Sequence, residues 1–183
     1  GFDPKLHTEV GIERLFKKSN CKLIPIDTNL INKIWIRKSI SKSGKFYKLS
    51  DKNTGQSSKN KVQKLSKILN KNKVDLQFIS APENVAWLLN IRGADSEFTP
   101  IPNSYLILDK KNKVYFFCSL KKINKKIRTD LSNVTIIDIN YIKEFLLKIN
   151  NKIIQLDKSS CSIFFKKIIK KNNLIVEKQR LSV

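Results

Sequence analysis

The sequence predicts an α/β fold in which helices cover a mixed β-sheet. After residue 58, short apolar runs typical of buried strands alternate with longer stretches whose apolar residues recur with the helical period. Two of the apolar runs, at 104–108 and 114–118, are joined by the turn DKKNK, which predicts an antiparallel hairpin within the sheet. A hydrophobic content of 40% over 183 residues is enough for a packed core.

The first fifty residues contain too few elements to form a domain of their own. Thr8 is a candidate N-cap for a helix whose apolar face carries Ile12 and Phe16. The run KLIPI at 22–26 predicts an edge strand, because Pro25 has no N–H to donate to a neighbouring strand. Residues 29–35 have helical spacing. We therefore expect residues 1–50 to be the C-terminal remnant of a preceding domain, together with a linker, within a longer protein.

The linker is expected from a change in composition at residues 38–60. This stretch, KSISKSGKFYKLSDKNTGQSSKN, is rich in serine, lysine, asparagine and glycine and poor in aliphatic residues. Such a composition is typical of a linker or of an extended segment that crosses from one domain to the next. It places a second, larger domain at residues 51–183.

The second domain is predicted to begin with an amphipathic helix at 58–70, for which Ser58 is a candidate cap. A strand at 75–80 follows. The sequence from Ser80 to Glu83 then has the form of a capping box with proline in the first turn of a short helix. After the hairpin, the pattern predicts helices at 120–128, 141–149 and 159–171 and strands at 134–139, 152–156 and 174–177.

A formal net charge of +22 is the most conspicuous feature of the composition. Binding of nucleic acid or of an acidic partner by a basic accessory module is one interpretation. The other is codon bias, because lysine, asparagine and isoleucine fill 75 of the 183 positions and only five of the 37 basic residues are arginine. Phosphate clamps and base readout favour arginine, and the lysines are spread over every segment as on solvated faces. We favour codon bias and expect no specific nucleic-acid partner.

Few residues suit catalysis or metal binding. His7 is the only histidine, and the 15 carboxylates are scattered singly, so neither a nucleophile–base pair nor a metal-ligand motif is evident. The three cysteines have no CxxC spacing, which indicates reduced thiols. No apolar run reaches the roughly 20 residues that span a bilayer, and the first ten residues have no apolar run of the kind found in a signal peptide. We expect no catalytic, metal or cofactor residue, no membrane contact and a cytoplasmic location.

Residues 79–108, ISAPENVAWLLNIRGADSEFTPIPNSYLIL, differ in composition from the rest of the chain. Lysine is absent from this stretch, and Trp87, Arg92, Gly93, Pro100 and Pro102 appear in it. We expect Trp87 to be buried and to fill a large volume of the core. We expect Gly93 to allow a sharp reversal through a backbone conformation that other residues resist.

These residues carry a resemblance to a known family. Among those that match are Trp87, Asn90, Arg92, Gly93 and Asp95, and GFDPKLHT, KLIPIDTNLINKIW and TGQSSKNKVQKLSKIL match in the same order along the chain. The chain resembles the end of domain one and the middle domain of three-domain Xaa-Pro aminopeptidases, in the creatinase-like pita-bread clan of metallopeptidases. Ala94 replaces the usual serine, and Asn32 the usual aspartate.

The resemblance implies a function for the whole enzyme and a different one for this chain. The family removes the N-terminal residue that precedes proline, acts as a homodimer, and uses two divalent metal ions, usually manganese. Their ligands belong to a third, catalytic domain. The resemblance therefore implies that this chain is non-catalytic, has that domain as its partner, and shapes substrate access and domain arrangement.

The motif loop is the candidate site that the resemblance implies. Trp87, Asn90, Arg92, Gly93 and Asp95 would lie at the rim of the cleft, with the charged groups of the loop at the surface beside the hairpin. The alternative, which we favour, is that these residues serve the fold alone.

Overall fold

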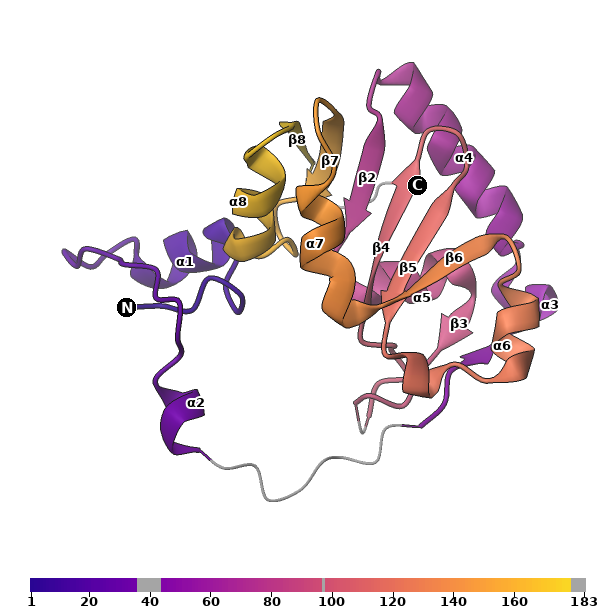
Figure 1. The fold of residues 1–183 in the computed structure, drawn as a ribbon, viewed down its shortest axis with the longest axis horizontal. Helices are drawn as coiled ribbons and strands as arrows, with labels where there is room; N and C mark the ends of the chain where they lie inside the picture. Colours follow the sequence, from indigo (N-terminus) through magenta and orange to yellow (C-terminus); the bar gives the residue numbers. More distant parts are fainter. Residues whose placement is uncertain (36–43, 97, 179–183) are drawn as a thin grey trace.

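The computed structural model describes residues 1–35, 44–96 and 98–178 (Figure 1). Its N-terminal segment contains two short helices, α1 (Glu9–Phe16) and α2 (Ile31–Ile34). The predicted cap of α1 is confirmed, because the Thr8 hydroxyl accepts a hydrogen bond of 3.0 Å from the backbone N–H of Gly11. Among the described residues, no helix is both long and apolar enough to cross a membrane.

The rest of the described chain folds around a six-stranded mixed sheet. Its order is β6 (Val134–Asp138), β5 (Val114–Cys118), β4 (Ser104–Asp109), β2 (Leu76–Ile79), β7 (Ile153–Asp157) and β8 (Leu174–Lys178). Strand β4 runs opposite to the other five, because it is antiparallel to both β2 and β5 while the remaining neighbours pair in parallel. The predicted mixed sheet and the predicted hairpin of β4 and β5 are both confirmed.

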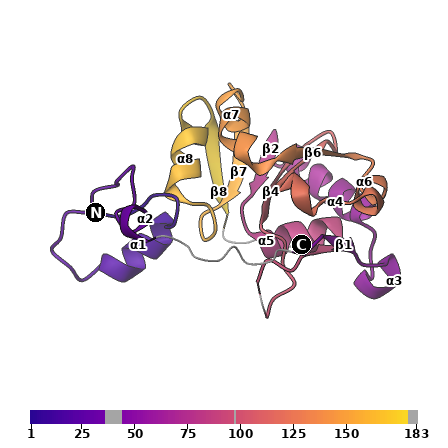
Figure 2. The same ribbon diagram turned by 60° about the horizontal axis from the view of Figure 1, so that its bottom comes forward.

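Helices cover both faces of this sheet (Figures 1 and 2). On one face, α4 (Ser58–Lys71), α5 (Pro82–Leu89) and α6 (Lys125–Asp130) pack on a core that contains Leu106 and Phe116. On the other face, α7 (Ile142–Leu147) and α8 (Ile163–Lys170) pack on a core that contains Ile107 and Phe117. Successive strand residues point to opposite faces, so the continuous apolar runs SYLIL and VYFFC supply both cores at once.

A second, two-stranded sheet connects the start of the larger domain to the motif loop. Strand β1 (Tyr47–Lys48) pairs antiparallel with β3 (Ile91–Arg92), and Phe46, just before β1, is only 1% exposed within the first core. The helix α3 (Asp51–Thr54) then leads to α4. Residues 36–43 of the expected linker lie outside the described residues, whereas residues 44–50 pack against the larger domain. The boundary at residue 50 stays a prediction.

Several predicted elements were wrong in detail. Residues 22–26 do not form a strand: Pro25 makes one isolated bridge with Phe2. The helix predicted at 29–35 is reduced to the four residues of α2. Ser57, not Ser58, caps α4 by accepting a hydrogen bond from Asn60 N. The helix predicted at 120–128 is a 3₁₀ turn (Leu120–Lys122) followed by α6, and a further 3₁₀ turn (Ile139–Tyr141) precedes α7.

Two of the differences at helix starts involve side-chain hydrogen bonds outside the helix. The predicted capping box at Ser80 does not form: its hydroxyl lies 2.8 Å from that of Ser160, and Ala81 occupies the N-cap position of α5. Helix α8 starts at Ile163 rather than 159, because Asp157 accepts a hydrogen bond from Ser159 N and holds the chain in a turn.

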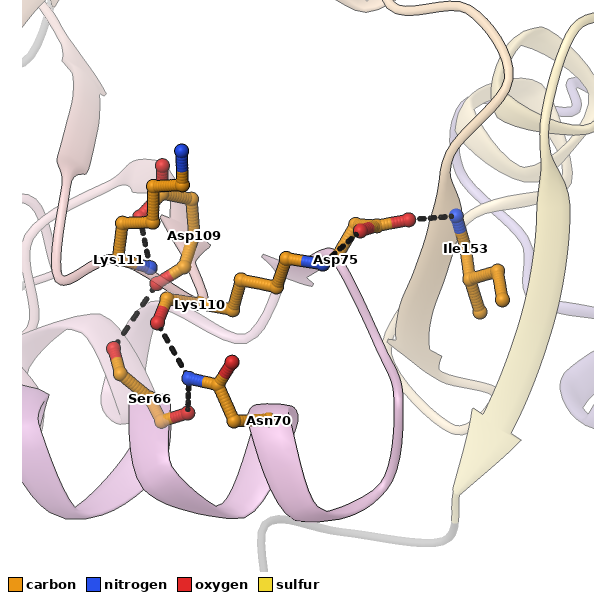
Figure 3. Close-up of polar contacts among 7 residues, drawn as sticks. All are labelled: Ser66, Asn70, Asp75, Asp109, Lys110, Lys111 and Ile153. Carbon is orange, nitrogen blue, oxygen red and sulfur yellow. Dashed lines mark hydrogen bonds and ion pairs between the residues drawn. The ribbon is translucent and has the colours of Figure 1, made fainter.

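One carboxylate joins three parts of the sheet (Figure 3). Asp75 precedes β2, accepts a hydrogen bond of 2.9 Å from Ile153 N at the start of β7, and pairs at 2.7 Å with the ammonium group of Lys110 in the hairpin turn. Ser66 and Asn70 of α4 donate to the carbonyl oxygens of Asp109 and Lys110 in the same turn. The N–H of Ile153, and next the Lys110 side chain, lower the pKa of Asp75.

Asp75→Asn is expected to destabilise the fold by about 1 kcal/mol at pH 7, through loss of one charge-assisted hydrogen bond and a partly exposed ion pair. A lowered pKa in the folded state means that the stabilisation is present above the unfolded pKa of about 3.9 and is lost as pH falls through the folded value. Urea unfolding at pH 7 and at about pH 3 should therefore show a difference that shrinks in acid. The exposed Asp27→Asn serves as the control, and an equal difference at both pH values would contradict the account.

Candidate functional site

The motif begins where α5 ends, at Asn90. This residue is fully buried and adopts the left-handed conformation, with φ of 55°, that closes the helix. Its side-chain amide donates to the carbonyl of Gln56 at 2.9 Å and to Asp51 at 3.2 Å. Its own carbonyl accepts a hydrogen bond of 2.8 Å from Leu49 N, next to β1. Asparagine suits this position because it tolerates the left-handed region and supplies a polar side chain to its surroundings.

A buried lysine from α4 meets Asn90. Lys61 is 2% exposed, and its ammonium group donates to the Asn90 side-chain oxygen at 2.6 Å and to the Trp87 carbonyl at 2.8 Å. The same nitrogen lies 4.5 Å from the centroid of the Trp87 ring, a cation–π contact. Burial, and next the charge of Arg92, lower the pKa of Lys61, while Asp51 acts in the opposite direction. We name Asp51, Lys61, Trp87 and Asn90 the Lys61 cluster.

Arg92 closes the last turn of α5 from the other side. Its guanidinium group donates to the carbonyl of Ile91 at 2.8 Å and to that of Ala86, within α5, at 3.4 Å. A cation at a helix C-terminus is favourable because the unpaired carbonyl groups there carry partial negative charge. These contacts give the half-buried Arg92 a role in the fold.

Gly93 is required for space rather than for an unusual backbone conformation. A Cβ atom at this position would lie 2.9 Å from the Cα of Pro102 and 3.1 Å from the Phe46 ring. The φ angle of Gly93 is not in the left-handed region, which in this motif is occupied by Asn90. The expectation that Gly93 adopts a backbone conformation that other residues resist was therefore wrong: the glycine instead allows Pro102 and Phe46 to approach the backbone closely.

Asp95 fastens the loop that follows. Its carboxylate pairs with the ammonium group of Lys122 and accepts a hydrogen bond of 2.6 Å from Asn103 N. The Asp95 side chain is 2% exposed, so the expectation that the charged groups of this loop lie at the surface was wrong for Asp95. Glu97 lies outside the described residues. Phe98, the next described residue, is 90% exposed.

The structure places the predicted residues in one continuous segment from α5 to the loop after β3, and it corrects what was expected of Trp87, Gly93 and Asp95. Trp87 is partly buried rather than fully buried: it packs against the first core, and the Lys61 ammonium group lies over its ring. Sequence reasoning missed Lys61 and Asp51. One signal was available for Lys61: it falls at helical spacing with Leu65 and Leu69, on the apolar face of α4. Because lysine recurs throughout the chain, this spacing alone does not distinguish Lys61.

The remaining candidates for chemistry are the metal-ligand residue types, the cysteines and the surface hollows. No group of three or more His, Cys, Asp or Glu side chains among them lies close enough to hold a metal ion. His7 contacts the ring of Phe2 in the N-terminal segment. Burial raises the pKa of Cys118 and that of Cys161 to about 12, so both are protonated thiols at neutral pH. A hollow of about 490 Å³ beside the start of α4 is lined mainly by lysine, serine, asparagine and aspartate side chains and by Val62, Val114, Leu131 and Val134.

Comparison with known proteins gives a consistent result. Residues 37–183 match the sequence profile of the creatinase/prolidase N-terminal domain. The chain is 35% identical over 99 residues to Xaa-Pro aminopeptidase 1 of Dictyostelium discoideum, covering 54% of this chain and 16% of that protein. It is 30% identical over 141 residues to Xaa-Pro aminopeptidase app-1 of Caenorhabditis elegans, covering 74% of this chain and 23% of that protein.

Solved structures share the fold. The crystal structure of X-prolyl aminopeptidase from Caenorhabditis elegans, described as a cytosolic enzyme with a di-nuclear active site, superimposes with a TM-score of 0.83 at 24% identity. That match covers 97% of this chain and 31% of the other. An N-terminal creatinase/prolidase-like domain from Corynebacterium diphtheriae matches with a TM-score of 0.50 at 17% identity, over 66% of this chain and 97% of that one.

Glycine is needed at position 93 because space is limited and at position 55 because φ is positive, and substitutions at the two positions distinguish these causes. Gly93→Ala is expected to cost about 1–3 kcal/mol, because the added methyl group meets the backbone of Pro102. Gly93→Asn should cost more, since it is larger. At Gly55, where φ is +71° and no atom lies within 4 Å of an added Cβ, Asn should cost less than Ala. Chemical denaturation of the four variants checks the order, and a Gly93→Asn variant more stable than Gly93→Ala would contradict it.

Proposed function

The chain belongs to the creatinase/prolidase N-terminal domain family, and from this membership we propose that it is a non-catalytic part of an Xaa-Pro aminopeptidase. Such an enzyme is a metallopeptidase that removes the N-terminal residue preceding proline. The observation that carries the proposal is the similarity to proteins named Xaa-Pro aminopeptidases. The chain spans less than a quarter of the length of these two relatives, so the activity would require further residues of a longer protein.

The residues of this chain do not fit a dinuclear metal centre. The Caenorhabditis elegans enzyme is described as having a di-nuclear active site. Two metal ions, which we propose to be manganese, need several carboxylate and imidazole ligands in one place. The described residues bring no three such side chains together, and His7 lies apart on the N-terminal segment. We therefore assign metal binding and catalysis to a separate catalytic domain and no step of the reaction to this chain.

The distribution of exposed apolar side chains supports the proposed domain arrangement. Among the described residues, nine of the fifteen exposed large apolar side chains lie in the first 35 residues. Large exposed apolar areas commonly mark a surface that another part of a protein covers. We propose that residues 1–50 are the end of a first domain with its linker and that residues 51–183 form the middle domain. The nine side chains are Leu6, Val10, Leu15, Phe16, Ile24, Leu30, Ile31, Ile34 and Trp35.

The motif loop is proposed as the rim of the substrate entrance. Its base is held by the contacts of Gly93 and by the Asp95–Lys122 pair, while Phe98 stays exposed. A fixed base with an exposed aromatic side chain suits a surface that limits which peptides enter. Trp87, Asn90 and Arg92 would act indirectly, by holding this base. The whole enzyme is proposed to be a cytoplasmic homodimer that acts on proline-containing peptides.

The purified chain is expected not to release the N-terminal residue of an Xaa-Pro peptide, with or without added Mn²⁺, because it lacks a ligand set for the metal. Release can be followed by chromatography of the products, with a longer protein that carries this chain as the positive control. Turnover that scales with the concentration of this chain alone, and that His7→Ala abolishes, would overturn the proposal.

The role of the rim is tested in that longer protein. Phe98→Ala should raise KM for longer peptides more than for short ones and leave thermal unfolding unchanged, because the Phe98 side chain is exposed. Tyr141→Ala, which also removes an exposed aromatic ring, is the matched control. Equal KM changes for the two variants would assign the loop to the fold alone.

A further inference from the structure

The first turn of α8 obtains hydrogen-bond acceptors from a distant part of the chain. The first amide groups of a helix have no acceptor within it. Here Ile163 N donates to the carbonyl of His7 and Phe164 N to that of Pro4, both at 2.9 Å. Ser162 caps the next amide, that of Phe165, at 3.4 Å. Residues more than 150 positions away thus complete the start of α8.

Side chains strengthen this contact. Lys166 of α8 forms ion pairs with Glu9 of α1 and with Glu177 of β8, and its side chain is only 18% exposed. Although burial opposes it, the hydrogen bonds to Glu177 and Glu9 raise the pKa of Lys166, which keeps the ammonium group charged. Nearby, the ammonium group of Lys5 lies 5.3 Å from the centroid of the Phe164 ring.

We propose that the first turn of α8 is a docking site within the chain for residues 4–9, and that this contact holds the N-terminal segment on the middle domain as one body. Figures 1 and 2 both place α1 beside α8, at the β8 edge of the sheet. The contact itself does not depend on the proposed function. Its consequence does: a preceding domain would take its orientation relative to the middle domain from this site.

The charges explain why one segment is specific for this site. The amide groups of a helix N-terminus favour carbonyl or anionic partners, and Lys166 favours a carboxylate. The N-terminal segment supplies both, with two carbonyl oxygens from Pro4 and His7 and the carboxylate of Glu9. Glu13, on the same helix α1, is exposed and pairs with no lysine among the described residues. Glu13 is therefore a matched control for Glu9.

Amide hydrogen exchange of the whole chain, measured by NMR, tests the docking. Ile163 and Phe164 should exchange at least about tenfold more slowly than Lys125 and Lys126, which begin α6 and for which no acceptor lies among the described residues. Glu9→Lys removes the attraction to Lys166 and replaces it with repulsion, so it should lower the protection of Ile163 and Phe164 by roughly fivefold or more. Glu13→Lys, which changes the net charge equally, should leave it unchanged.

Two results would overturn the proposal. One is exchange of Ile163 and Phe164 as fast as that of Lys125 and Lys126 in the unmodified chain, which would mean that the segment is not docked. The other is an equal effect of Glu9→Lys and Glu13→Lys, which would mean that net charge, not this contact, controls the protection. Neither result depends on peptidase activity, so failure of the docking proposal is distinguishable from failure of the proposed function.

Discussion

The buried ammonium group of Lys61 is the constraint on which the motif depends. An unpaired charge in a protein interior costs several kcal/mol, so Lys61 is tolerated only where acceptors surround it. The Asn90 side chain, the Trp87 carbonyl and the Trp87 ring provide this environment. Because Asn90 also binds Gln56 and Leu49, the same interaction fixes α4, the end of α5 and the approach to β1 relative to one another. The path of the motif loop follows from this arrangement.

Some features set by neighbouring residues could be predicted from the sequence, although the local turn at Asp157 and Ser159 was missed. Side-chain contacts between distant residues could not be predicted. The Thr8 cap and the β4–β5 hairpin depend on residues within a few positions, and both were found. The capping box at Ser80 failed because the hydroxyl of Ser160, 80 positions away, is its neighbour. The family resemblance directed attention to the motif loop, but only the structure showed that Gly93 leaves room for Pro102 and that the Asp95 side chain is buried against Lys122.

Family membership is established over most of the chain, while the part that this domain takes in peptide cleavage is a proposal. The residues that carry the resemblance mostly hold the fold: Arg92 donates to the carbonyl group of Ala86 in α5, and Asp95 pairs with Lys122. Phe98 follows these residues in the sequence, and its side chain is exposed while the base of the loop is held in place. The contact between α8 and the N-terminal segment likewise depends on polar groups that lie far apart in the sequence. These groups hold the N-terminal segment against α8.

The most direct test of this account is a double-mutant cycle between Lys61 and Asn90, with unfolding free energies measured in urea. Lys61→Met removes the charge and keeps the apolar stem, and Asn90→Gly removes the side chain but tolerates the left-handed backbone. A coupling free energy of about 1.5 kcal/mol or more is expected, as for a buried hydrogen bond to a charged group. The exposed Lys64→Met paired with Asn90→Gly should be additive. Additivity of Lys61→Met with Asn90→Gly would contradict the claim that this interaction organises the motif.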